Sequence, residues 1–327
     1  MPTTFIILVR EYYKKRRGNM FKYILKRLVY GFLTFLIIMT LTFFLMHSIP
    51  GGPFDGDALT KMPPEVQANL MEKFGLDKPL GEQYLTYMNN LFHGELGISI
   101  SYAPRSVKSI IVSEIPVTAT LALTSISITI VLGILFGIVA ALKQGKWQDQ
   151  VSKVLTTLGI TIPSFVMCTL LIYVFAVKLR ILPTMGFDGP KNLILPATAL
   201  SFGSIATLSR LTRSSLLDVV RQDYVRTAKA KGLKNSVVIF KHALKNSLLP
   251  VVTYLGPLVT SLLTGSFVVE KIFAIPGIGR EMVSAIGDRD YTMILGLTAI
   301  FSIIMIASFL IVDILYALID PRVKLDS

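Results

Sequence analysis

Few residues in this sequence are spaced for catalysis or for binding a nucleotide or a metal. The chain contains no G-x-x-x-x-G-K-[ST] motif, which would bind the phosphates of ATP, and its single Gly-Lys pair is Gly145-Lys146. The three histidines, His47, His93 and His242, lie far apart in the sequence and match no zinc-ligand pattern. The sequence therefore predicts no catalytic residue, no metal site and no cofactor bound by this chain.

One acidic residue, Asp313, lies inside a long apolar stretch. A carboxylate within a membrane raises the hypothesis of proton coupling. Asp313 follows the start of its stretch near Met293 by about 20 residues, or about 30 Å of helix. We therefore expect it near one membrane surface and predict a structural ion pair, with a proton-coupled carrier as the alternative from another class.

Small and weakly polar residues recur at three- or four-residue spacing near position 260: Thr253, Gly256, Thr260 and Thr264. On a helix this spacing places them on one face. Such residues are typical of close packing between membrane helices, and Gly133 and Gly137 have the same spacing. The face near position 260 has a second interpretation, as the lining of a polar translocation pathway, and both stay open here.

These residues need elements that position them, and the composition indicates membrane helices. Of the 327 residues, 52% are hydrophobic and 16% are charged, with a mean hydropathy of +0.63, whereas about 25% charged residues is usual for soluble domains. A helix of about 20 apolar residues crosses a bilayer. Six such stretches predict an all-α integral membrane protein: 28–46, 117–142, 154–177, 193–211, 250–269 and 293–318.

The basic residues are distributed unequally between the two sides of these spans. One side carries 22 Lys and Arg residues and the other 11. The positive-inside rule then places both termini of this multi-pass membrane protein in the cytoplasm. The net charge of +13 is explained by this topology and by contact with membrane lipid, so we expect no nucleic-acid partner.

The spans divide the chain into segments. The segment 49–116 is predicted to form a small extracytoplasmic domain, with a helix from Glu65 that ends at Gly75, and it serves as a cap or as a docking surface. Residues 1–19 precede Met20, which resembles a natural start, and we expect the first span to be an uncleaved anchor. The full division is a cytoplasmic N-terminal segment (1–27), the first membrane helix (28–48), the extracytoplasmic domain (49–116), a transmembrane domain (117–318) and a cytoplasmic tail (319–327).

The cytoplasmic loop 212–249 is basic and contains two predicted short helices. The first begins at Asp223, whose charge suits a helix N-terminus, and Lys229 and Lys231 suit its C-terminus. Gly232 can adopt the left-handed conformation that ends the helix. By itself this pattern also fits a segment that lies on anionic lipid.

The same loop carries a resemblance to a known family. The stretches DYVRTAKAKGL (223–233) and KHALKNSLLP (241–250) resemble the signature of permease subunits in binding-protein-dependent ABC importers, specifically the first of two permeases in oligopeptide, dipeptide and nickel importers. The Glu-Ala-Ala of the wider superfamily is replaced by Arg226, Thr227 and Ala228. Supporting stretches are HSIPGGP (47–53), GLDKPLGEQY (75–84), GELGIS (94–99), IPSF (162–165), VVEKIFAIPGIGR (268–280), RDY (289–291) and VDILYALIDPR (312–322).

The resemblance implies a type I ABC importer permease fold, a location in the bacterial inner (plasma) membrane and an assembly of several chains. The implied partners are a homologous second permease, two ABC ATPase subunits that bind ATP and Mg, and an extracytoplasmic peptide-binding protein. The loop would form a coupling helix that docks on an ATPase, through Asp223, Tyr224, Val225, Arg226, Thr227, Ala228, Lys229, Ala230, Lys231, Gly232 and Leu233.

The function expected from the resemblance is a non-catalytic, channel-forming subunit that couples ATPase movement to alternating access for oligopeptides. The same role in a dipeptide or nickel importer, a proton-coupled carrier and a membrane-bound enzyme are the alternatives.

Overall fold

The structure is a computed structural model, and it describes residues 2–50, 63–102 and 104–319. For residues 2–21, 67, 70, 73, 264–265 and 315–319 it describes the helix but not the side chain. Within these ranges the chain is helical, and its one β-bridge joins Ile98 to Ser106. Residues 320–327 of the predicted tail lie outside the described ranges.

Five long apolar helices cross the molecule, and a bent pair of helices forms the remaining span. The five are α1 (Pro2–Ser48), α4 (Val107–Leu142), α7 (Pro190–Val220), α11 (Leu249–Ile272) and α13 (Tyr291–Ile319). The bent pair is α5 (Trp147–Thr161) and α6 (Ser164–Leu171), which continues into the π-helical segment η1 (Ile172–Lys178). The predicted six-span, all-α membrane architecture is confirmed.

The span predicted at 154–177 is wrong as a single straight helix. Its two halves meet at an angle of 111°. The break falls at Ile162, which is extended (φ −77°, ψ 119°), and at Pro163. Proline has no backbone N–H and disfavours helical conformation in the residue before it, so the chain turns here although hydropathy stays high.

The second span begins at Val107, ahead of the predicted start at 117. The first turns of α4 contain polar residues such as Lys108, which lower the hydropathy there, and Pro116 lies within the helix. Val107, Ile110 and Ile111 are buried against Ile278 and Met293, so tertiary contacts extend the helix beyond its apolar part.

A glycine allows close contact between α4 and α7, and an ion pair joins α1 to α13. A Cβ added to Gly137 of α4 would lie 2.7 Å from the Ser209 carbonyl oxygen of α7, which confirms the predicted packing role of this glycine. Arg27 Nε of α1 lies 3.1 Å from Asp313 Oδ2 of α13. The predicted structural pairing of Asp313 is therefore confirmed.

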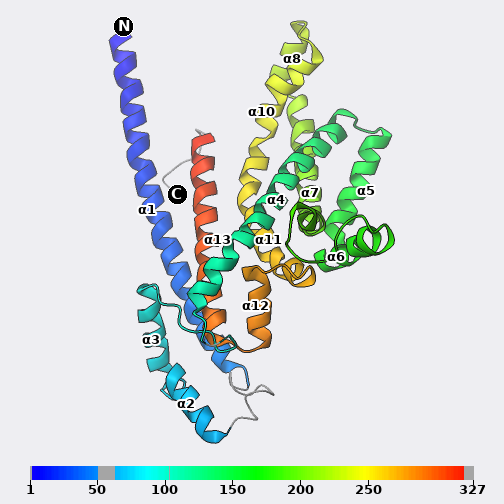
Figure 1. Cartoon of the computed structure of the whole chain (residues 1–327). Coiled ribbons are helices and arrows are strands. Elements are labelled where there is room, and N and C mark those ends of the chain that lie inside the picture. The colour runs from blue at the N-terminus through cyan, green and yellow to red at the C-terminus, as the bar shows by residue number, and fades with distance from the viewer. Residues whose placement is uncertain (1, 51–62, 103, 320–327) are drawn as a thin grey trace.

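Short helices lie at both ends of the bundle (Figure 1). One end, named the α8 end, holds the first residues of α1, the α4–α5 turn and α8 (Asp223–Ala230), which is followed by α9 (Asn235–Val237), η2 (Val238–Ala243) and α10 (Leu244–Ser247). The opposite end, named the α3 end, holds α2 (Pro64–Phe74) and α3 (Leu80–Phe92). The predicted helix before Gly75 is confirmed, because Gly75 ends α2 in the left-handed conformation (φ 66°).

Candidate functional site

The helix α8 projects from the bundle directly after the long helix α7 (Figure 1). Gln222 is extended before it, and the Gln222 carbonyl accepts the first helical hydrogen bonds, from the backbone N–H groups of Val225 (3.1 Å) and Arg226 (3.2 Å). At its other end Gly232 has φ +76°, as the sequence predicts. No heavy atom lies within 4 Å of a Cβ built on Gly232, so its need for glycine is conformational rather than steric.

Two side chains anchor α8 to the bundle. Val225 is fully buried and Ala228 is buried one turn later, and both belong to a cluster with Leu216 of α7 and Val238 of η2. A hydrogen bond also joins α8 to α10, because Asn246 Nδ2 donates to Tyr224 Oη over 2.9 Å. The other predicted coupling residues are exposed: Asp223, Arg226, Thr227, Lys229, Ala230, Lys231, Gly232 and Leu233.

The exposed face of α8 is polar and positively charged. The Arg226–Asp223 ion pair spans 3.7 Å between well-exposed side chains, and such pairs contribute little to stability. The arrangement is a short helix that is fixed on one side by apolar packing and is exposed on the opposite side.

The residues predicted as a pathway on α11 do not share one open face. Thr253 is exposed and Thr260 is half-buried, whereas Gly256 is buried against α13, where an added Cβ would lie 3.2 Å from Val312 Cγ1. The side chain of Thr264 lies outside the described residues. Gly256 therefore serves helix packing, which was one of the two interpretations left open by the sequence.

A different face of α11 borders a cavity of about 310 Å³ at the α5–α6 break. Tyr254 and Ser261 line it from α11, Ser164 from α6, and Ser204 and Thr207 from α7. These side chains place five hydroxyl groups around the space, so the cavity offers hydrogen-bond donors and acceptors among the spans.

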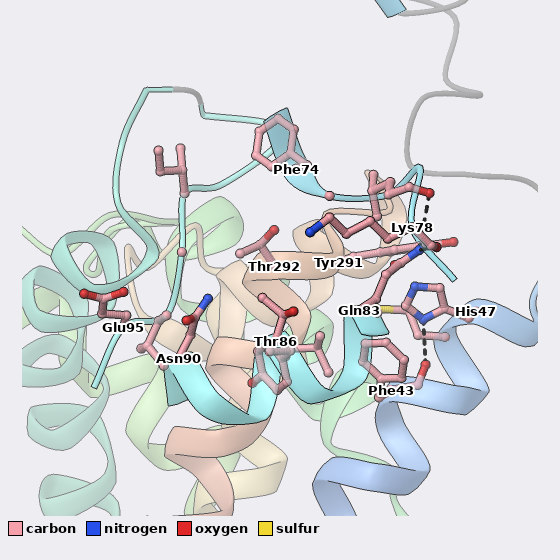
Figure 2. Close-up of a pocket in the computed structure, with 18 residues that line it drawn as sticks. Phe43, His47, Phe74, Lys78, Gln83, Thr86, Asn90, Glu95, Tyr291 and Thr292 are labelled. Carbon is pink, nitrogen blue, oxygen red and sulfur yellow. Dashed lines mark hydrogen bonds between the residues drawn. The ribbon is translucent and has the colours of Figure 1, made fainter. Parts of the chain in front are cut away.

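A second cavity, of about 330 Å³, lies at the α3 end between the last turns of α1, the α2–α3 segment and the start of α13. Figure 2 shows Glu95 and Lys78 on opposite sides of it, with the His47 ring beside Phe43. Hydrogen bonding to Glu82, at 3.0 Å, raises the pKa of the Lys78 ammonium. The cavity thus combines aromatic walls with charges of both signs.

His47 has a defined tautomer in this cavity. Its Nδ1 lies 2.8 Å from the Phe43 carbonyl oxygen, which only accepts, so Nδ1 carries the proton in the neutral ring. Nε2 is then a hydrogen-bond acceptor, and among the described residues neither it nor the buried Tyr87 Oη has a partner. Burial raises the pKa of Tyr87.

Comparison with known proteins identifies the family of this chain. Residues 133–325 match the family described as "Binding-protein-dependent transport system inner membrane component", and residues 20–124 match the N-terminal region of such membrane components. The chain belongs to this family. The dipeptide transport system permease protein DppB of Bacillus subtilis (strain 168) is 45% identical over 306 residues, which cover 94% of this chain and 99% of that protein.

Another relative is similar over almost the same length. The oligopeptide transport system permease protein OppB of Escherichia coli (strain K12) is 41% identical over 307 residues, covering 93% of this chain and 100% of that protein. The fold of the inner membrane component is also shared with a chain of the inward-facing MetNI methionine ABC transporter, at a TM-score of 0.54 and 17% identity, covering 64% of this chain and 96% of that chain.

One of the signature stretches, 268–280, contains the residues that hold the start of α12 (Ile278–Gly287) against the bundle. The fully buried Glu270 accepts hydrogen bonds at Oε2 from the backbone N–H groups of Gly279 (2.8 Å) and Arg280 (3.0 Å). Thr118 of α4 accepts from the N–H of Ile278 over 3.0 Å. The stretch 268–280 thus fixes the N-terminus of α12 to α11 and α4, a role that sequence reasoning missed.

Two further signatures of the family meet at Asp290. Its Oδ2 accepts from Ser99 Oγ and from the Ser101 N–H (3.0 Å), and its Oδ1 accepts from the Met293 N–H (3.0 Å). Asp290 therefore caps α13 and holds the loop 97–102 against it. An aspartate directly before an apolar run is an N-cap signal, and this signal would have found the capping role but not the distant loop.

We expect Asp290→Ala to lower the stability of the purified permease complex by about 3 kcal/mol, because three hydrogen bonds to a buried carboxylate are lost. The readout is the apparent unfolding temperature in detergent. Asp288→Ala, at an exposed position two residues away, is the matched control and should leave that temperature nearly unchanged. Equal effects of the two substitutions would contradict the capping role.

Proposed function

We propose that this chain is the permease subunit of an ATP-driven, binding-protein-dependent importer of peptides. The observation that carries this proposal is the similarity of nearly the whole chain to a dipeptide permease (45%) and an oligopeptide permease (41%). Asp313 is paired with Arg27, so it offers no support for the proton-coupled alternative.

In the proposed orientation the α8 end faces the cytoplasm and the α3 end faces outward. The excess of Lys and Arg on the α8 side, 22 against 11, supports this orientation by the positive-inside rule. Both termini then lie in the cytoplasm, and α2, α3 and their cavity form the extracytoplasmic surface on which a peptide-binding protein would dock.

The proposed coupling element is α8 together with Gly232 and Leu233. Its exposed face would contact an ATPase subunit, which would bind ATP and Mg, while Val225 and Ala228 would transmit the displacement to α7 and η2. The burial of these two anchors supports the assignment, because a rigid-body shift passes only through packed side chains. A homologous second permease and a second ATPase would complete the assembly.

The proposed pathway follows the Tyr254 and Ser261 face of α11 rather than the face of Gly256. Hydroxyl groups around the cavity at the α5–α6 break would bind the backbone groups of a peptide in transit. The bend at Pro163 would help passage, since broken helices in membrane proteins occur where they line a cavity.

We predict that Ser261→Cys is labelled by an aqueous maleimide in the assembled complex and that Gly256→Cys is not. Leu258→Cys, at a fully buried position of the same helix, is a second unreactive control, and the buried native Cys168 gives little background. Labelling of Gly256→Cys without labelling of Ser261→Cys would refute the proposed face.

The function is tested by reconstitution in proteoliposomes with a homologous second permease, ABC ATPase subunits and a peptide-binding protein. We expect uptake of radiolabelled di- and oligopeptides that requires both ATP and the binding protein. Uptake driven by a proton gradient alone, or ATP-dependent uptake of Ni²⁺ without peptide uptake, would reject the proposal.

A further inference from the structure

A third cavity, of about 350 Å³, opens among α4, α5 and α7 and is named the α4–α5–α7 groove. Its walls are mostly apolar: Phe136 and Val139 of α4, Val151 and Leu155 of α5, and Phe202 of α7 line it. About half of the surface of Phe136, Val139, Val151 and Leu155 is exposed (45–47%), so these walls are open to the lipid phase in the single chain. From Gln148 to Leu155 the groove follows roughly 10 Å of α5.

One end of this groove is polar. Gln148 and Ser209 line it, and neither Gln148 Oε1 nor Ser209 Oγ has a hydrogen-bond partner among the described residues, although Ser209 is only 1% exposed. Two other hydroxyl groups of α7 donate to the carbonyl four residues earlier, Ser201 to Ala197 and Thr207 to Gly203. Ser209 instead keeps a donor that the apolar walls cannot satisfy.

The polar end is also positively charged. Lys143 and Lys146 are exposed on the turn between α4 and α5, at the α8 end of the molecule. The acid nearest in sequence, Asp149, is fully buried and accepts two hydrogen bonds from Arg213 (2.7 and 2.9 Å). Its carboxylate is therefore paired with Arg213 rather than with Lys143 or Lys146. Trp147 is 71% exposed at the rim, where a membrane surface favours tryptophan.

We propose that the α4–α5–α7 groove is a binding site for an anionic phospholipid. Lys143 and Lys146 would bind the phosphate, Ser209 would donate to a phosphate or ester oxygen, and an acyl chain would cover Phe136, Val151 and Leu155. Basic pockets between membrane helices on the cytoplasmic side are suited to anionic head groups. Charge at one end, an unsatisfied donor beside it and an apolar remainder match the phosphate, the ester groups and the acyl chain of a phospholipid.

The site has a structural consequence. A lipid in the groove contacts α4, α5 and α7 next to the Asp149–Arg213 ion pair, so it would hold α5 against the helix that leads into α8. The proposal itself is independent of the transported substrate.

The test is native mass spectrometry of the assembled complex, incubated in detergent with phosphatidylglycerol or with phosphatidylcholine of the same acyl chains. We expect retention of phosphatidylglycerol and roughly 10- to 30-fold weaker binding in Lys143→Gln/Lys146→Gln, since each basic residue contributes about 1 kcal/mol near anionic lipid. Lys178→Gln/Lys191→Gln removes two exposed charges elsewhere and should bind normally. Equal binding by both double variants, or of both lipids, would overturn the proposal.

Two further measurements separate the lipid from other occupants. Ser152→Trp fills the groove without changing charge and should reduce binding, whereas Thr157→Trp, on an exposed face of α5 that does not line the groove, should not. In the unmodified complex, raising ionic strength from about 0.1 to about 1 M should weaken retention, because the Debye length falls from about 10 to about 3 Å. Retention insensitive to salt, or a photo-cross-linker at Val151 that captures the second permease instead of lipid, would reject the site.

Discussion

Val225→Asp is expected to reduce ATP-driven peptide uptake to less than about a tenth of normal, because it places an unpaired carboxylate in the packed contact that anchors α8. Val225 is fully buried with Leu216 and Val238. A helix of eight residues is too short to persist on its own in water, so without this anchor α8 loses its fixed position. The measurements are uptake into proteoliposomes and stimulation of ATPase activity by the peptide-loaded binding protein.

Val237→Asp is the matched control for this prediction. Val237 is exposed in the same segment and lies outside the predicted coupling residues. The control should keep most of the uptake, and size-exclusion chromatography should show assembled complexes for both variants. If Val225→Asp transports at the normal rate in intact complexes, the anchoring role of Val225 in coupling is wrong. If Val225→Asp assembles, hydrolyses ATP and yet ignores the binding protein, coupling through α8 is supported.

Asp149→Ala should give the largest loss of stability in the chain, about 3–5 kcal/mol, because it leaves a positive charge unpaired in a mostly buried site. Asp149 is fully buried and joins three groups: Arg213 of α7 through two hydrogen bonds, the Gly145 N–H at 2.9 Å and Lys153 at 3.4 Å. These contacts hold the start of α5 against the last turns of α7. The readout is the apparent unfolding temperature of the purified complex.

The double variant Asp149→Leu/Arg213→Met tests the cause of that loss. Removing both charges leaves no unpaired ion, so we expect it to be more stable than Asp149→Ala. Glu82→Ala, which breaks the exposed pair with Lys78, is the surface control and should change stability by less than about 1 kcal/mol. A double variant as unstable as Asp149→Ala would show that packing, and not the unpaired charge, causes the loss.

Local chemistry in the sequence determined the number of spans, the end of α2 and the turn after α8. Hydropathy over a span is a sum of side-chain properties, so it needs no knowledge of neighbours. Gly75 and Gly232 both end their helices in the left-handed conformation, because glycine alone adopts it without a steric penalty. The placement of Asp313 near the end of a span likewise predicted its ion pair.

The tertiary structure decided which surface each helix presents to which neighbour. Spacing places Gly256 and Ser261 on faces of α11. Only the position of α13 shows that Gly256 is covered, and only the positions of α6 and α7 show that Ser261 borders a cavity. The 111° angle of the bend at Pro163 was also decided by the tertiary structure, because a proline marks a break in a helix without fixing its angle.

The contacts that join distant segments of the chain could not be predicted from the sequence either. Asp149 and Arg213 are 64 residues apart, and Ser99 and Asp290 are 191 apart. Helical periodicity relates residues only a few positions apart, whereas these pairs form because packing of whole helices brings their ends together. The sequence alone therefore determined a six-span permease with a short helix that ends at Gly232. The tertiary structure decided which buried charges join α5 to α7 and which helix faces border cavities.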